Sequence, residues 1–102
     1  MSHSQWQPLS SQSVALSGAL DREHVHDLWK FIKQWTPAGS TLDVELKQVE
    51  RIDSAGMVML IHLIEHAKKR NCHIMFSFVP EQLRTLFQLS NVESLIAQHI
   101  KN

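Results

Sequence analysis

The chain of 102 residues has little of several things that common functional classes require. Cys72 is its one cysteine, so an internal disulfide is impossible and a reducing compartment is expected. Ten basic residues balance ten acidic ones, which leaves no broad positive surface for nucleic acid or anionic lipid. The three glycines stand alone, at positions 18, 39 and 56, and form no phosphate-cradling loop. These features argue against binding of nucleic acid or nucleotides.

Long apolar runs are scarce as well. The longest, Met57 to Ile64, is interrupted by His62 and is far shorter than the ~20 residues of a membrane-spanning helix. No N-terminal segment combines a basic flank, an apolar stretch and a small-residue cleavage site. A hydrophobic share of 43% and a charged share of 20% are ordinary for a soluble globular protein. We therefore expect one cytoplasmic domain over residues 1–102, without direct membrane insertion.

Alternating apolar residues predict three strands. They lie in residues 13–18 (SVALSG), 41–47 (TLDVELK) and 73–79 (HIMFSFV), the last with Phe78 on the inward face beside Ile74 and Phe76. Residues 1–12 are expected to be either a frayed tail or a short edge strand.

Apolar spacings of three and four predict helices between and after these strands. Asp21 is the expected N-cap of the first helix, whose apolar side chains are Val25, Leu28, Ile32 and Trp35. Asp53 and Ser54 both suit the N-cap of the second helix, which ends near residues 70–71. Pro80 is expected to start a short helix, and Ser90 or Asn91 to cap a last one.

This order of elements predicts an α/β fold with a mostly parallel sheet. Strands covered on both faces are continuously apolar, whereas Asp43 and Glu45 place charge at alternate positions of an inner strand. The helices should therefore pack mainly on one face of the sheet.

The second helix has an unusual start. On a helical wheel its sheet-facing stripe comprises Met57, Leu60, Ile61, Ile64 and Ala67. Val58 falls among the polar residues and Met59 at their border. Gly56 lies in the first turn, where glycine costs roughly 0.5–1 kcal/mol relative to alanine. Either a partner's backbone approaches closely there, or the strand-to-helix turn is tight; the spacing does not choose between them.

Residues 53–56 (DSAG), between an alternating strand and an apolar helix, resemble the STAS family of sulfate transporter and anti-sigma-factor antagonist domains. The resemblance spans nearly the whole chain, and residues 60–71 (LIHLIEHAKKRN) are most similar to the stand-alone STAS subunits of Mla-type phospholipid ABC transporters. It implies the STAS fold and a non-catalytic cytoplasmic subunit. Such a subunit binds and supports the ATPase of the transporter, and it is peripheral to the inner membrane through the ATPase and its permease. The transporter maintains outer-membrane lipid asymmetry.

The same resemblance leaves a second function open. Anti-sigma-factor antagonists bind a kinase-type anti-sigma factor and are switched by phosphorylation of the serine at the position of Ser54. A hydroxyl residue occurs there in both branches, so Ser54 does not distinguish them. In either case the helix start is the expected partner-binding surface. We predict that it comprises Asp53, Ser54, Ala55, Gly56, Val58, Met59, His62 and Trp29, the last at the edge of its helix's apolar stripe.

Two patterns with catalytic associations carry less weight. His62, Glu65 and His66 match the H-x-x-E-H signature of zinc peptidases, but a third ligand, a general base and a cleft are not evident. Cys72 and His73 are adjacent at a strand start, so their side chains point to opposite faces. We therefore expect no enzyme activity, no metal and no cofactor.

Overall fold

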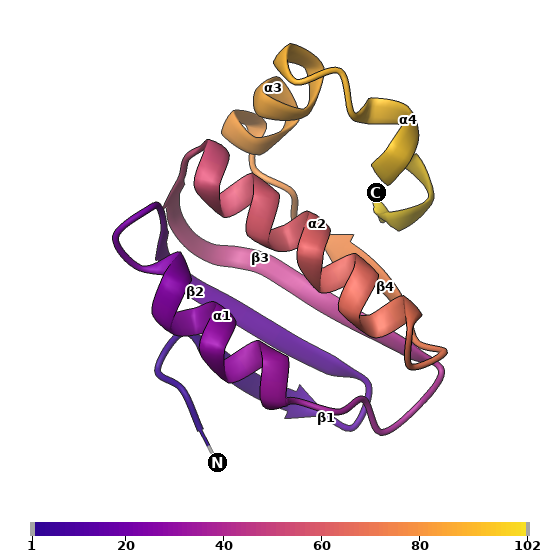
Figure 1. Ribbon diagram of the computed structural model, residues 1–102. Helices are drawn as coiled ribbons and strands as arrows, with labels where there is room; N and C mark the ends of the chain where they lie inside the picture. Colours follow the sequence, from indigo (N-terminus) through magenta and orange to yellow (C-terminus); the bar gives the residue numbers. More distant parts are fainter. Residues whose placement is uncertain (1, 102) are drawn as a thin grey trace.

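The computed structural model describes residues 2–101 as a layer of helices on a four-stranded sheet (Figure 1). Its elements in chain order are β1 (Trp6–Ser10), β2 (Ser13–Leu20), α1 (Val25–Gln34), β3 (Thr41–Ile52), α2 (Ser54–Lys68), β4 (His73–Ser77), α3 (Glu81–Leu89), α4 (Glu93–Ile96) and the 3-10 turn η1 (Ala97–His99). Among these residues, no helix is both long enough and apolar enough to cross a membrane.

The sheet has the order β1-β2-β3-β4. β2, β3 and β4 run parallel, and β1 pairs antiparallel with β2, so the sheet is mostly parallel, as predicted. Of the two alternatives for residues 1–12, the structure has the edge strand, although Met1 lies outside the described residues. Trp6 anchors this strand because its side chain is buried in the core.

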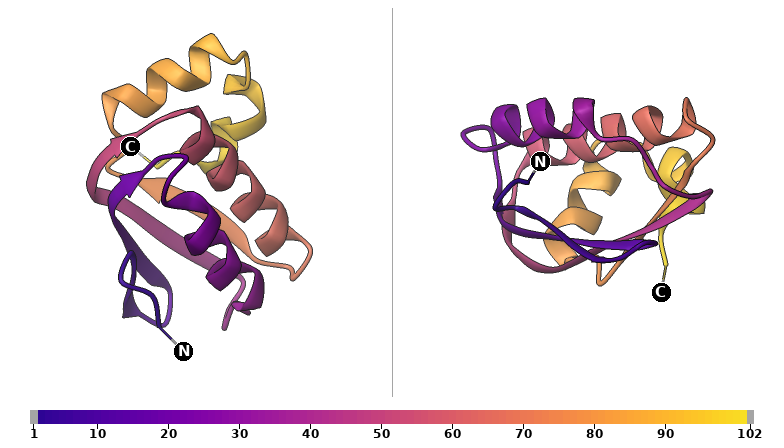
Figure 2. Two further views of the ribbon diagram at one scale, coloured as in Figure 1. Left: turned by 60° about the vertical axis from the view of Figure 1, so that its left-hand side comes forward. Right: turned by 90° about the horizontal axis from the view of Figure 1, so that it is seen from below.

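The helices lie mainly on one face, as the alternation in β3 predicted. Figure 2 shows α1 and α2 side by side over one face of the sheet, with α3 and α4 at one end. Leu42, Val44 and Leu46 are buried beneath the helices, whereas Asp43 and Glu45 between them are only half-buried. One strand thus supplies both the core and a polar outer face.

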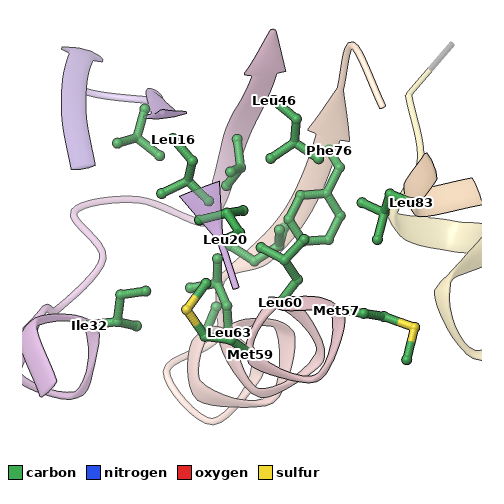
Figure 3. Packing of buried hydrophobic residues seen from close by; sticks show 14 of the residues in the cluster. Leu16, Leu20, Ile32, Leu46, Met57, Met59, Leu60, Leu63, Phe76 and Leu83 are labelled. Carbon is green, nitrogen blue, oxygen red and sulfur yellow. The ribbon is translucent and has the colours of Figure 1, made fainter. Parts of the chain in front are cut away.

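The core fills the space between this sheet face and the helices (Figure 3). Phe76 and Leu20 are fully buried, and Leu60 and Leu63 of α2 pack against the same cluster. Figure 3 also shows Leu83 of α3 beside Phe76, so α3 closes the end of the core that α1 does not reach.

Three local predictions are wrong. Helix α4 has Val92 as its N-cap, without a side-chain hydrogen bond, so neither Ser90 nor Asn91 caps it. Helix α1 begins at Val25 rather than directly after Asp21, because Asp21 accepts backbone hydrogen bonds from Glu23 and His24 and holds a turn ahead of the helix. β4 ends at Ser77, and Phe78, predicted to face inward, is 58% exposed with φ of 55°. The left-handed backbone turns its side chain out of the strand's alternation.

Candidate functional site

The start of α2 is fixed by Asp53. Its extended backbone places Oδ1 3.1 Å from the backbone nitrogen of Gly56, which donates a hydrogen bond to it. Oδ2 accepts a second hydrogen bond, from the backbone N–H of Arg22 at 3.2 Å. Asp53 is therefore the N-cap, as its residue type suggested, and it also ties the β2–α1 turn to the helix start.

Gly56 serves the chain's own packing. A Cβ atom at this position would lie 2.0 Å from the carbonyl oxygen of Leu20 and 2.8 Å from Cγ1 of Ile52. The same Leu20 oxygen accepts the backbone N–H of Asp53 at 3.2 Å. Of the two explanations for this glycine, the tight strand-to-helix junction accounts for it. Gly56 is buried and cannot form part of an exposed surface.

Next to this junction, α2 presents a row of outward side chains. Ser54 and His62 are exposed, Val58 is 44% exposed, and Ala55 between them is half-buried. Their spacing of four residues places Ser54, Val58 and His62 along one side of the helix. The structure thus brings four of the eight predicted site residues together on α2.

Trp29 joins this row from α1. Its ring lies 5.6 Å from that of His62 and 6.0 Å from that of His66, between centroids. Trp29 is half-buried at the seam between the two helices. We refer to Ser54, Ala55, Val58, His62 and Trp29 as the α2 surface.

Met59 is a wrong prediction. Its side chain is only 4% exposed, and Figure 3 shows it extending from α2 toward Ile32 of α1, inside the core. The buried stripe of α2 consists of Gly56, Met57, Met59, Leu60, Leu63 and Ala67. Ile61 and Ile64, which were expected within the stripe, are half-buried at its margin. The reason is that α1 packs against α2 and covers the side that carries Met59 and Leu63.

A charged cluster lies beside the α2 surface. Asp21 Oδ1 is 2.6 Å from Nδ1 of His24, and Oδ2 accepts hydrogen bonds from Nε and Nη2 of Arg51 at 3.1 and 2.8 Å. The hydrogen bonds from His24 and from Arg51 lower the pKa of Asp21 from 3.8 to about 2. The same hydrogen bond to Asp21 raises the pKa of Arg51. The carboxylate is therefore ionised, and both charges are engaged with each other.

This cluster was not predicted from the sequence, although a signal for it exists. Ala19 pairs with Arg51 and Leu20 with Ile52, so Asp21 and Arg51 stand at the same ends of adjacent parallel strands. Opposite charges at such matched positions favour an ion pair across the sheet end.

The two patterns with catalytic associations do not assemble into sites. Nε2 of His66 lies 2.8 Å from the carbonyl oxygen of Trp35 and donates to it, while the His62 ring packs at a tilt against that of Trp29. Among residues 2–101, no three His, Cys, Asp or Glu side chains are grouped so as to hold a metal ion. Cys72 is buried, and this burial raises the pKa of its thiol, which suits a structural residue.

Comparison with known proteins places this arrangement in a family. The family model described as the STAS domain of MlaB matches residues 4–97. Two relatives, from Escherichia coli K12 and Shigella flexneri, are both named intermembrane phospholipid transport system binding protein MlaB. Each is 33% identical over 83 residues, which cover 81% of this chain and 84% of the relative.

Solved structures share the fold at lower identity. The anti-sigma factor antagonist SpoIIAA in its unphosphorylated form has a TM-score of 0.71 at 17% identity, covering 95% of this chain and 84% of that chain. A sulfate transporter family protein from Wolinella succinogenes has a TM-score of 0.68 at 19% identity, covering 92% and 78%. The strand order, the one-sided helices and the capped start of α2 thus belong to a STAS domain, and the chain is a member of the MlaB STAS family.

Proposed function

We propose that the chain is a non-catalytic subunit of a phospholipid ABC transporter that binds the transporter's ATPase through the α2 surface. In this proposal it works in the cytoplasm and reaches the inner membrane through that ATPase and its permease. The name of its two relatives, intermembrane phospholipid transport system binding protein, supports the assignment to phospholipid transport.

The observation that carries the proposal is the character of the α2 surface. Ser54, Val58 and His62 form an exposed row, and the imidazole of His62 is the one ionisable side chain in it. Covering such a row removes little hydration from charged groups, and the apolar part of Val58 and Trp29 gains from burial. Large aromatic side chains at such a seam are typical anchors of protein interfaces.

Rigidity of the helix start supports the same role. Asp53 caps α2, and Gly56 lets the helix approach the backbone of Leu20 directly. A partner therefore meets a surface that is already ordered, which lowers the entropic cost of binding. Asp53 and Gly56 act as positioning residues beneath the surface rather than as contacts.

The chemistry of the neighbouring residues supports a non-catalytic role. The Cys72 thiol is buried with a raised pKa, and the His66 ring donates to a backbone carbonyl. Neither group is poised as a nucleophile or a general base.

A second candidate function is a phosphorylation-controlled antagonist of an anti-sigma-factor kinase. The observation in its favour is the position of Ser54, whose exposed hydroxyl stands at the first residue of α2. A phosphate there would add about 1.5 to 2 negative charges at pH 7, next to the positive end of the helix dipole. Such a group would change a docked interface without unfolding α2.

Affinity purification from native membranes separates the two functions. The full chain carrying a tag should recover an ABC ATPase together with its permease, which mass spectrometry would identify. Recovery of a soluble histidine-kinase-type ATPase in place of the transporter would favour the second function. The variant Val58→Glu provides the specificity control, because it alters the α2 surface and should lose the genuine partner.

Substitutions at Ser54 test how the partner uses the hydroxyl. If Ser54 is a hydrogen-bonding contact, Ser54→Ala and Ser54→Asp should both weaken ATPase binding in a calorimetric titration. If Ser54 is a phosphorylation switch, Ser54→Ala should bind like the unmodified protein and Ser54→Asp should not bind. Ser11→Asp, an exposed serine in the β1–β2 turn, adds the same charge far from α2 and should leave binding unchanged.

A further inference from the structure

A pocket of about 410 Å³ opens on the other side of the molecule. It is lined by Asp43, Ser77, Phe78, Val79, Arg84 and Lys101. Because Val44 and Phe76 point into the core, their neighbours Asp43 and Ser77 point to the sheet face away from α1 and α2. Figure 1 shows β4, the start of α3 and the C-terminal segment meeting at this edge of the sheet. The volume of the pocket lies within the range of small-molecule sites.

Two buried polar atoms in this pocket have no hydrogen-bond partner among residues 2–101. They are Oγ of Ser77, a residue only 8% exposed, and Oδ1 of Asp43. Leaving such an atom unpaired is unfavourable, and buried polar groups are almost always paired. A carboxylate oxygen only accepts hydrogen bonds, so Asp43 Oδ1 can pair only with a donor, and residues 2–101 supply none.

Phe78 at the pocket mouth is an independent sign of a binding site. A bulky residue with φ of 55° is strained, and such strain concentrates at functional positions. The same backbone geometry holds the ring in solvent, where burial against a ligand would be favourable.

The pocket has an excess of positive charge. Lys101 Nζ lies 3.6 Å from Oδ2 of Asp43, and Arg84 lines the same wall. Lys47 Nζ lies 5.4 Å from the centre of the Phe78 ring, at the mouth. Among the lining residues, two cationic side chains, Arg84 and Lys101, accompany one carboxylate, Asp43, which favours a ligand with an anionic group.

We propose that this pocket binds a small anion that also carries a hydrogen-bond donor, such as a phosphate or carboxylate with a nearby amine. Lys101 binds the anionic group. The amine donates to Oδ1 of Asp43, Ser77 completes the polar contacts, and Phe78 covers the carbon linker. A free metabolite and a lipid headgroup share this chemistry. The site lies on the sheet face opposite the α2 surface, so it does not depend on the ATPase-binding proposal.

Amide chemical shifts of the 15N-labelled full chain provide the test. Titration with O-phosphoethanolamine should shift the amides of residues 77–79, 43 and 101 in a saturable manner. Inorganic phosphate lacks the amine and ethanolamine lacks the anion, so each should bind on the order of tenfold more weakly. Equal shifts with inorganic phosphate would mean an adventitious anion site only, and shifts that never saturate would mean a pocket filled by water. Either result overturns the proposal.

Matched variants assign the binding to these side chains. Lys101→Gln and Ser77→Ala should each weaken binding of O-phosphoethanolamine, Lys101→Gln by on the order of tenfold and Ser77→Ala by less. Lys33→Gln on α1 removes the same charge from the opposite face and should bind like the parent. The spectra themselves report whether each variant is folded. Unchanged affinity in folded Lys101→Gln would contradict the proposal.

Vesicles distinguish the two sources of the ligand. If the source is a lipid headgroup, the chain should sediment with phosphatidylethanolamine vesicles more than with phosphatidylcholine vesicles, and Lys101→Gln should abolish the difference. If the source is a free metabolite, O-phosphoethanolamine should bind and neither vesicle should sediment the chain. Both outcomes support the pocket as an anion site and differ only in what delivers the ligand.

Discussion

The two halves of α2 share one buried stripe but differ in what they present outward. In the front half, residues 54–62, the outward side chains are Ser54, Val58 and His62. In the rear half, residues 63–68, they are Glu65 and Lys68, and the exposed Lys69 and Arg70 follow directly after the helix. Packing against the sheet cannot explain the difference, because Gly56 and Leu60 in front and Leu63 and Ala67 behind are equally buried.

The contrast between the two halves of α2 indicates which half loses its bound water at a low cost in free energy. Moving a charged group out of water is costly unless it gains a partner, whereas hydroxyl, methyl and neutral imidazole groups lose less hydration. The rear half is therefore suited to remain in solvent, and the front half is suited to be covered. The small residues of the front half have separate reasons, since Gly56 faces the chain's own backbone and Ala55 faces outward.

Gly56→Ala should have the largest effect, and it should act on folding. The new Cβ would meet the carbonyl oxygen of Leu20, which cannot withdraw without losing its hydrogen bond from Asp53. We expect a loss of about 3 kcal/mol in the free energy of unfolding, measured by guanidinium chloride denaturation.

The neighbouring alanine is the control for this prediction. Ala55→Gly alters flexibility at the same turn without a clash and should cost only roughly 0.5–1 kcal/mol. If Gly56→Ala were as stable as Ala55→Gly and instead weakened ATPase binding, the glycine would belong to the partner interface after all.

Val58→Glu should have the next largest effect, and it should act on binding. A carboxylate placed at the centre of the α2 surface would be buried without a partner in the complex. Because Val58 is 44% exposed in the free chain and not part of the buried stripe, its replacement should change the free energy of unfolding little. We expect affinity for the ATPase to fall on the order of 100-fold in a calorimetric titration.

Lys69→Glu places a carboxylate at the C-cap of the same helix, directly after its rear half. If the two halves differ as described, this variant should bind the ATPase with nearly the parent affinity. Equal losses in Val58→Glu and Lys69→Glu would show that the partner covers the whole helix and that the contrast between the halves has no functional meaning.

Much of the fold followed from local patterns in the sequence. The alternation in β3 predicted both a buried face and a polar one, and hence the one-sided helices. Phe78 was misplaced because alternation assumes that a strand continues, and a single left-handed residue ends it. The start of α1 was misplaced because an N-cap residue type does not reveal that Asp21 caps a separate turn, residues 22–24, ahead of the helix.

The site was predictable to the extent that it lies on one helix. Periodicity placed Ser54, Val58 and His62 outward, and the residue types of Asp53 and Ser54 indicated the helix start. Met59 was misassigned because a wheel defines only the sheet-facing side, and α1 covers a second side of α2. The pocket at Asp43 and Ser77 was missed because it assembles residues from β3, β4, α3 and the C-terminal segment.

Asp21→Asn should have the smallest effect, visible in the pH dependence of stability. The folded pKa of Asp21 is about 2, below its ordinary 3.8, because His24 and Arg51 favour the ionised carboxylate. A lowered pKa contributes stability above about pH 4 that is lost as the pH falls toward 2. The parent chain should therefore lose its advantage over Asp21→Asn across this window, measured as thermal midpoints of both proteins.

This last measurement also concerns the front half of α2, because Arg51 lies next to its start and is neutralised by Asp21. In Asp21→Asn the Arg51 charge is released beside Asp53, so the front half becomes more like the charged rear half, and ATPase affinity should fall slightly at neutral pH. Glu50→Gln, which removes an exposed carboxylate on β3, is the control and should keep the parent's midpoint profile. If the midpoints of the parent and Asp21→Asn differ by the same amount from pH 7 to pH 2, ionisation of Asp21 contributes nothing to stability. The low charge of the front half would then depend on residues 54–62 alone.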